Sequence, residues 1–214
     1  MEDTNRCAKK LRQAHRAHSH GAYQGGDHMT IGFAVCGSFC TFSKIFPVME
    51  ALSATYDILP IFSETVWNTD TRFGTALSHI RRATEICGRE PIHTIAQAEP
   101  IGPKKLLDAL IVAPCTGNTL AKLSHGIADT AVTMAVKSHL RNGRPVIVAV
   151  STNDGLGTAA ENIGRLLARK NYYFVPLGQD DPNEKPTSLI ADPGSIADTL
   201  SAAIEGRQFQ PVGI

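Results

Sequence analysis

The chain has 214 residues, of which 43% are hydrophobic and 19% charged, and 21 Lys and Arg residues nearly balance 20 Asp and Glu residues. These values are typical of one soluble globular domain, and a formal net charge of +1 lacks the strong positive field on which nucleic-acid binding relies. No run approaches the roughly 18 apolar residues that cross a bilayer, so we expect a cytoplasmic protein without nucleic-acid or membrane partners.

Residues 1–28 differ in composition from the rest of the chain. They contain four of the eight histidines and a basic cluster between Lys9 and Arg16, with no sustained apolar period. We interpret them as an N-terminal extension, disordered or vector-derived, and place a single flavoprotein-like α/β domain in residues 29–214. His15, His18 and His20 lie in this extension, where a metal site would lack fixed geometry, so no metal is predicted.

From Thr30 on, apolar runs of strand length alternate with segments of helical period. The runs predict strands within residues 31–36, 56–63, 108–114, 145–151 and 171–177, and the periodic segments predict helices around 42–52, 73–86, 132–140, 156–167 and 196–204. Continuous apolar strands are typical of a parallel sheet that is covered on both faces. With right-handed crossovers the pattern predicts a three-layer, doubly wound parallel sheet, a Rossmann-like or flavodoxin-like α/β fold.

Glycine and proline refine this prediction. Gly88, Gly143 and Gly206 each follow a helical stripe, which predicts left-handed residues at the helix ends. Pro47 lies inside the first stripe and predicts a kink or a late helix start. The polar segment 178–194 contains three prolines and is predicted to be a long loop, of the kind that often forms a lid or a binding loop.

Polar residues follow four of the predicted strands. Their tips read GSFCT (37–41), SET (63–65), PCTGNT (114–119) and STNDG (151–155). In an open parallel sheet ligands bind outside the carboxyl ends of the strands, and such residues supply backbone N–H groups and hydroxyls that suit a phosphate. Neither GxxxxGK[ST] nor a GxGxxG after the first strand occurs, so the ordinary nucleotide fingerprints are absent. The alternative is that these residues only cap helices, but four such tips together favour a ligand site.

The third tip and the segment after it carry the most specific motif. IVAPCTGNTLAKLSHGIAD, residues 111–129, resembles the superfamily of flavin-binding cysteine decarboxylases and flavin prenyltransferases, and the likeness covers about residues 29–205. The resemblance implies FMN as the cofactor. It assigns cofactor binding to Gly37, Ser38, Phe39, Ser63, Thr65, Pro114, Thr116, Gly117, Asn118, Thr119 and Asn153.

Other segments, among them IFSETV and STNDGLGTAAENIG, are similar to one branch of that superfamily. Its members are subunits of a heteromeric oxidoreductase that makes a pyridine dicarboxylate during sporulation. The resemblance implies a partner subunit that binds NAD(P), a small dicarboxylate substrate, and a homo-oligomer. Activity is expected only when the partner chain is present.

Two alternatives remain open: a stand-alone FMN-dependent decarboxylase or prenyltransferase, and a non-catalytic cofactor-binding subunit. The decarboxylases carry a catalytic histidine shortly before the third strand. Pro100 stands at that place, while His79 and His93 are off register, which counts against decarboxylation.

Forming an aromatic pyridine requires loss of a proton and of a hydride equivalent, so a cofactor and a general base are needed. His125 and His79 are the candidate bases, against the alternative that each is a surface or capping histidine. Five residues are candidate cationic partners for the substrate carboxylates. They are Arg81, Arg82, Lys104, Lys105 and Lys185. The alternative for each is an ordinary charged side chain in solvent.

Five cysteines, an odd and widely spread set, argue against a disulfide framework. Cys36 and Cys40 lack the further ligands that a structural zinc would need. We expect Cys36, Cys40 and Cys115 to be small buried thiols.

Overall fold

The computed structural model describes residues 29–213, so the predicted N-terminal extension lies outside the described residues. Five strands form a parallel sheet in the order β2-β1-β3-β4-β5. They are β1 (Thr30–Val35), β2 (Asp57–Phe62), β3 (Ala109–Cys115), β4 (Val146–Thr152) and β5 (Tyr172–Phe174). This order is that of flavodoxin-like sheets, and it confirms the predicted fold class and all five predicted strands.

Two short strands extend the sheet in the antiparallel direction, so the sheet is mixed and not wholly parallel. β7 (Leu189–Ala191) pairs with the end of β4 through Ser151↔Ile190 and also pairs with β6 (Leu177–Gly178). Both lie at the ends of the segment predicted as one long loop, and that prediction was wrong there. Strands of two or three residues are too short to show a period of two.

Eight helices accompany the strands within the described residues. They are α2 (Phe42–Ser53), α3 (Glu64–Asn68), α4 (Ala76–Cys87), α5 (Ile95–Ala98), α6 (Gly117–His125), α7 (Ala131–Leu140), α8 (Ala159–Leu167) and α9 (Ile196–Ile204). Three 3-10 turns, η1 (Phe39–Thr41), η2 (Glu99–Ile101) and η3 (Pro193–Ser195), complete the set. α2 runs through Pro47 directly after η1, and Gly88, Gly143 and Gly206 have the predicted left-handed φ of 67°, 68° and 76°.

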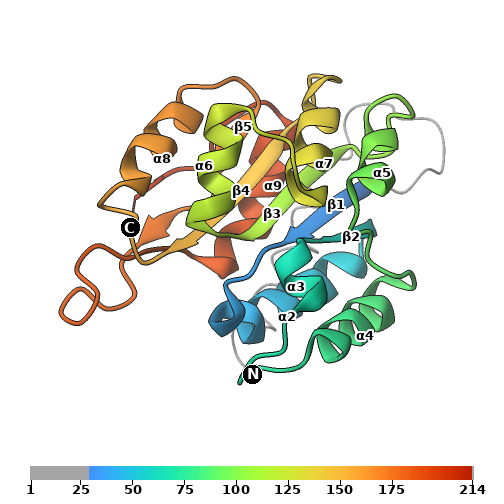
Figure 1. Ribbon diagram of the computed structural model, residues 1–214. Helices are drawn as coiled ribbons and strands as arrows, with labels where there is room; N and C mark the ends of the chain where they lie inside the picture. Colours follow the sequence, from blue (N-terminus) through green and yellow to red (C-terminus); the bar gives the residue numbers. More distant parts are fainter. Residues whose placement is uncertain (1–28, 214) are drawn as a thin grey trace.

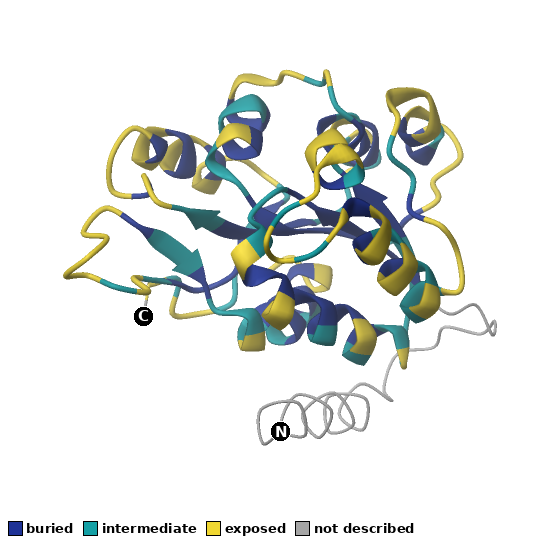
Figure 2. Cartoon of the chain, turned by 60° about the horizontal axis from the view of Figure 1, so that its bottom comes forward, coloured by how far each residue is buried: buried dark blue, intermediate teal, exposed yellow. Residues whose placement is uncertain are grey.

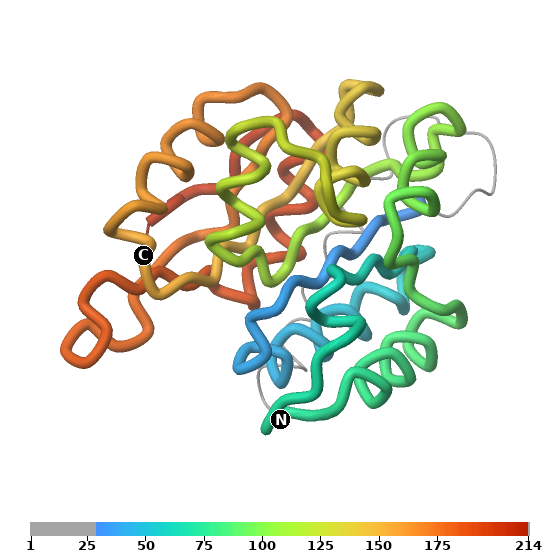
Figure 3. The backbone as a smooth tube through the Cα atoms, in the orientation of Figure 1, coloured from blue at the N-terminus to red at the C-terminus, as the bar shows by residue number. Residues whose placement is uncertain are grey.

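The helices form two layers (Figure 1). α5, α6, α7 and α8 cover one face of the sheet, while α2 and α9 pack on the other and α4 contacts α2 beside β2. β1, β3 and β4 lie between these layers and are almost entirely buried, whereas exposed residues lie on the outer helix faces (Figure 2). The tube in Figure 3 shows residues 179–188 extending from the carboxyl edge of the sheet. Among the described residues, no helix has the length and hydrophobicity that a membrane crossing needs.

Candidate cofactor and substrate site

The carboxyl ends of four strands meet at one edge of the sheet. The Oγ atoms of Ser38, after β1, and Ser151, in β4, are 2.8 Å apart. A Cβ added to Gly37 would lie 2.9 Å from Thr65 Cγ2, so the tips of β1 and β2 touch. In the same way, a Cβ on Gly117 would lie 2.8 Å from the Oγ1 atom of Thr152, which brings the tips of β3 and β4 together.

Three of the tip hydroxyls serve the fold itself. Ser63 Oγ accepts a hydrogen bond from Val66 N at 3.4 Å and caps α3. Thr116 Oγ1 accepts from Thr119 N at 3.4 Å and caps α6. The Thr119 side chain is buried, and its Oγ1 donates to Cys36 Sγ at 3.4 Å. For Ser63 and Thr116 the helix-capping alternative describes what the side chains do.

Donors for an anion remain at the start of α6. The backbone N–H groups of Gly117 and Asn118 belong to the first turn, which has no intrahelical acceptor for them. α6 has nine residues, and the positive end of its dipole favours a phosphate at this point. The side chain of Asn118, in the same turn, is exposed, as is that of Thr65 at the tip of β2. The chemistry of these donors fits the phosphate of FMN.

Other residues assigned to the cofactor surround this point. Phe39 is half-buried and packs on Phe42, with ring centroids 5.1 Å apart. Asn153 has an exposed side chain, and its backbone oxygen accepts a hydrogen bond from Thr187 Oγ1 at 2.7 Å. Pro114 borders a cavity of only ≈ 10 Å³ between β3, β4 and β7. The tips therefore pack closely there.

A larger cavity, of ≈ 550 Å³, lies beside the end of β2. Its walls come from Glu64, Trp67 and Asn68 of α3, from residues 93–96 around the start of α5, and from residues 129–131 at the start of α7. Its volume falls within the range of small-molecule sites. The cavity therefore offers space for a substrate next to the strand tips.

His93 borders this cavity. Its ring stacks on Trp67, with centroids 3.5 Å apart and planes at 6°, and its backbone N–H donates to Gln97 Oε1 at 2.9 Å. The Nδ1 atom is buried and has no hydrogen-bond partner. In the sequence, His93 is off register relative to Pro100. The segment between His93 and β3 contains α5 and η2, which a count along the sequence does not take into account.

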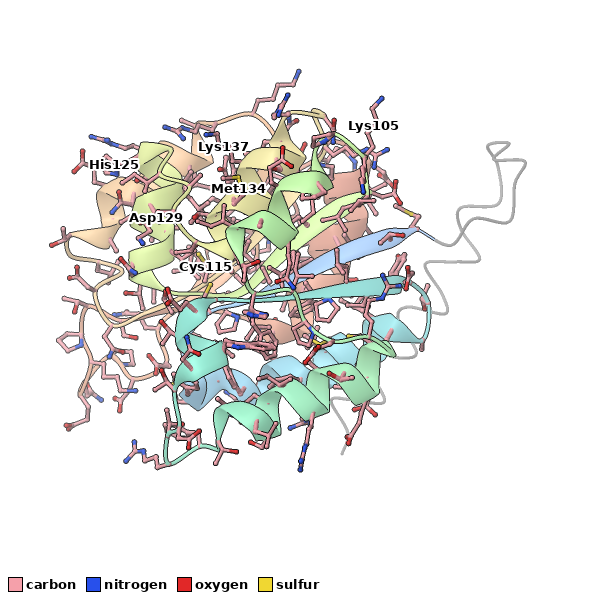
Figure 4. All side chains as sticks on the ribbon, turned by 45° about the vertical axis from the view of Figure 1, so that its right-hand side comes forward. Lys105, Cys115, His125, Asp129, Met134 and Lys137 are labelled. Carbon is pink, nitrogen blue, oxygen red and sulfur yellow. The ribbon has the colours of Figure 1, made fainter. Side chains whose placement is uncertain are left out.

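The two predicted bases lie elsewhere. His79 is buried with Phe42 and Phe46 (centroids 4.9 and 6.0 Å from its ring), and burial lowers the pKa of its imidazole, as does Arg82. His125 is exposed at the last residue of α6, where Ala121 O lies 2.9 Å from its Nδ1 atom. Figure 4 shows His125 well away from Cys115, which marks the end of β3. The structure brings neither histidine to the ≈ 550 Å³ cavity.

The five candidate cations also lie outside that cavity. Arg82 lies over the Phe46 ring, 4.9 Å from its centroid, and Lys185 pairs with Asp180 at 3.0 Å. The remaining three, Arg81, Lys104 and Lys105, are exposed. Within residues 29–213, no Lys or Arg side chain lines the cavity, whereas the carboxylates of Glu64 and Asp129 border it.

The cysteines are free thiols in the described part of the chain. Cys36 and Cys115 are buried as predicted, and burial raises the pKa of both, for Cys36 to about 11. Cys40 is instead exposed, with its Sγ atom 3.9 Å from Ser38 Oγ, so the prediction of a buried thiol was wrong there. No group of three or more His, Cys, Asp or Glu side chains within residues 29–213 is placed to hold a metal ion.

Comparison with known proteins identifies the protein family of this chain. The family model described as Flavoprotein matches residues 21–199, and the chain belongs to this family. It is 40% identical over 183 residues to the B subunit of dipicolinate synthase from Bacillus subtilis (strain 168), a match that covers 85% of this chain and 92% of that protein.

Two solved structures are also similar to this chain. The crystal structure of the B subunit of dipicolinate synthase from Bacillus halodurans C superposes with a TM-score of 0.80 at 42% identity, covering 87% of this chain and 96% of that one. The FMN-dependent cysteine decarboxylase SpaF shares the fold, with a TM-score of 0.62 at 23% identity and coverage of 83% and 95%.

Proposed function

We propose that this chain is the flavin-binding B subunit of a dipicolinate synthase. With a nicotinamide-binding A subunit it forms pyridine-2,6-dicarboxylate from dihydrodipicolinate or its hydrated precursor, in the cytoplasm during sporulation. The observation that carries the proposal is the meeting of four polar strand tips, Ser38 against Ser151 among them, in a chain 40% identical to the B subunit of a dipicolinate synthase. We also propose that the chain assembles as a homo-oligomer.

The tips and the cavity have separate roles in this proposal. The N–H groups of Gly117 and Asn118, with the hydroxyls of Ser38 and Thr65, hold the FMN phosphate. Bound FMN would supply an acceptor for a hydride equivalent. The cavity beside Trp67 holds the substrate ring, and NAD(P) belongs to the partner subunit.

His93 is the residue we propose to take up the substrate proton. Aromatisation removes one proton and one hydride equivalent, and a neutral imidazole is suited to accept the proton near neutral pH. The Nδ1 atom of His93 has no hydrogen-bond partner among the described residues of the protein, and the Trp67 stack fixes the ring plane. His79 and His125 would need access to the cavity that their positions do not provide.

The same histidine favours a second candidate function. A stand-alone flavin decarboxylase was disfavoured because no histidine stood in register, and His93 at the cavity removes that objection. The alternatives differ in whether the chain acts alone.

One experiment separates them. The purified chain is titrated with FMN by fluorescence and then incubated with dihydrodipicolinate, with and without the A subunit, while pyridine-dicarboxylate absorbance is recorded. We expect FMN binding, and product only when both subunits are present. Carbon dioxide release by the chain alone from a peptide with a C-terminal cysteine would favour the decarboxylase, and absence of FMN binding would favour a non-catalytic subunit.

A further inference from the structure

A groove of ≈ 510 Å³ lies on the helical layer that α6 and α7 form. Leu123, Ile127, Val136, Leu140 and Tyr172 give it apolar walls. It includes the last turn of α6, the second half of α7 and the start of β5. α6 begins at the strand tips and α7 ends before β4 starts, so the groove lies toward the opposite edge of the sheet from the cofactor residues. Figure 4 shows Lys137, on α7, far from Cys115 at the end of β3.

Four cationic side chains border the groove: Lys137 on α7, Arg141 directly after its last residue, and Arg169 and Lys170 before β5. Among residues 29–213, no Asp or Glu lines it. None of the four forms an ion pair with a carboxylate in the described part of the chain.

One of the cations is held in place by the backbone. The Arg169 guanidinium donates to the carbonyl oxygens of Leu123 at 3.2 Å and Ser124 at 2.7 Å, at the end of α6. Its charge is therefore fixed at one side of the groove, while Lys137 and Arg141 extend from α7.

These features define the ligand chemistry. Cations on two sides attract a molecule with an anionic group at each end, and the apolar walls favour a hydrophobic body between them. Ile127 is 47% exposed in the absence of an occupant, which is apolar surface that a ring would cover. A polyphosphate without an apolar body would leave these walls in water.

We propose that this groove is a second small-molecule site, which binds a planar aromatic dicarboxylate. The choice of pyridine-2,6-dicarboxylate as the probe rests on the proposed function, in which that molecule is the product. The two helices that border the groove also reach the first site, because α6 carries Gly117 and Asn118 and α7 begins at the substrate cavity. A product site here would thus lie on the elements that also contact cofactor and substrate.

The test is isothermal titration of the full chain with pyridine-2,6-dicarboxylate in metal-free buffer, with and without FMN. We expect binding that Lys137→Gln/Arg141→Gln weakens by about tenfold or more, and that weakens further as salt is added. The matched double variant Lys104→Gln/Lys105→Gln removes two exposed charges outside the groove and should bind as the wild type does. His93→Gln, which alters the substrate cavity, should also retain this binding.

Four results would overturn the inference: no binding by the wild type, equal binding by Lys137→Gln/Arg141→Gln, equal binding of the neutral pyridine-2,6-dicarboxamide, or tighter binding of adenosine monophosphate at the same residues. Unfolded variants are recognised by their melting curves. The titration needs no A subunit. Groove binding without enzymatic activity in the mixed assay would therefore count against the proposed function alone, and activity without groove binding would count against this inference alone.

Discussion

His139 lies fully inside the protein, near the end of α7, with its Nε2 atom 3.1 Å from the Pro145 carbonyl oxygen. Its Nδ1 atom is buried without a partner. Burial is the main cause that lowers the pKa of this imidazole, to about 4, and the Arg144 charge acts in the same direction. At neutral pH the folded protein therefore holds a neutral His139.

This makes the stability of the fold sensitive to acid. In the unfolded chain His139 takes up a proton near its usual pKa of 6.5, whereas the folded protein takes it up only near pH 4. Between these values the unfolded state binds more protons, so the free energy of unfolding falls as the pH falls. From pH 7.5 to pH 5 the loss is about 2 kcal/mol from this residue.

Urea unfolding at the two pH values measures this loss. His139→Gln lacks the titrating group, and we expect its stability to change less with pH by about that amount, although it starts lower at pH 7.5. Asn183→Ala, at an exposed position without a titratable group, is the control and should keep the wild-type slope. An identical pH dependence in His139→Gln and the wild type would contradict the argument.

Asn118 tests the cofactor assignment at the level of one side chain. It is exposed in the first turn of α6, so Asn118→Ala removes a polar group without opening the core. We expect the FMN dissociation constant to rise about five- to tenfold, the usual effect of one lost hydrogen bond, with an unchanged melting temperature. FMN titration by fluorescence measures it, with Asn183→Ala in the loop 179–188 as the control. Unchanged affinity in Asn118→Ala would remove this residue from the site.

At the scale of elements, the prediction from sequence succeeded where apolar residues form a continuous run or a clear helical period. The five main strands are continuous apolar runs, and α2, α4, α7, α8 and α9 show a clear helical period. α3 and α5 have five and four residues, and such lengths leave no period to detect. Position along the chain did not reveal the cavity either, because α5 and η2 lie between His93 and β3 while His93 lines the ≈ 550 Å³ cavity.

Two exposed glycines, one at a helix end and one inside a helix, allow a matched pair of substitutions. Gly88 ends α4 at φ 67°, and its N–H donates to Thr84 O at 2.8 Å, whereas Gly164 lies inside α8 with open space where a Cβ would be. Gly88→Ala places a side chain in the left-handed region and should destabilise the protein by about 1 kcal/mol. Gly164→Ala should stabilise it by about 0.5–1 kcal/mol.

Chemical denaturation of the two variants beside the wild type checks the sign as well as the size. Both substitutions add the same methyl group at an exposed position, so hydrophobicity alone predicts equal effects. Changes of opposite sign in the free energy of unfolding would show that backbone conformation determines the effect of each substitution. Equal shifts would contradict the C-cap argument for Gly88.

At the scale of the whole molecule, the strand tips of the candidate site could be predicted from the sequence, whereas the ≈ 550 Å³ cavity could not. The strand tips could be predicted because the order of a parallel sheet places all carboxyl ends at one edge. The ≈ 550 Å³ cavity could not, because it forms where α3, α5 and α7 begin, and three separate segments meet there only after the chain has folded. The groove beside Lys137 has the same origin, between α6, α7 and β5.

The hydrophobic core sets a boundary for the folding unit. Within residues 29–213 its buried cluster begins at Ile31 and ends at Ala203, and Met29 packs against it. We therefore predict that a chain beginning at Met29 folds as the full chain does, since it keeps every one of these core positions. Its melting temperature should agree with that of the full chain within about 2 °C, because a change of 1 kcal/mol would move it by about 2–4 °C at this size.

FMN affinity provides the second readout for the shortened chain. All residues assigned to the cofactor lie between Gly37 and Asn153, inside the retained part. Equal dissociation constants for the two chains would show that the cofactor site and the folding unit both lie in residues 29–214. If the shortened chain melts several degrees lower or loses FMN, residues 1–28 contribute to the domain, and the boundary drawn from composition would have to move toward the N-terminus.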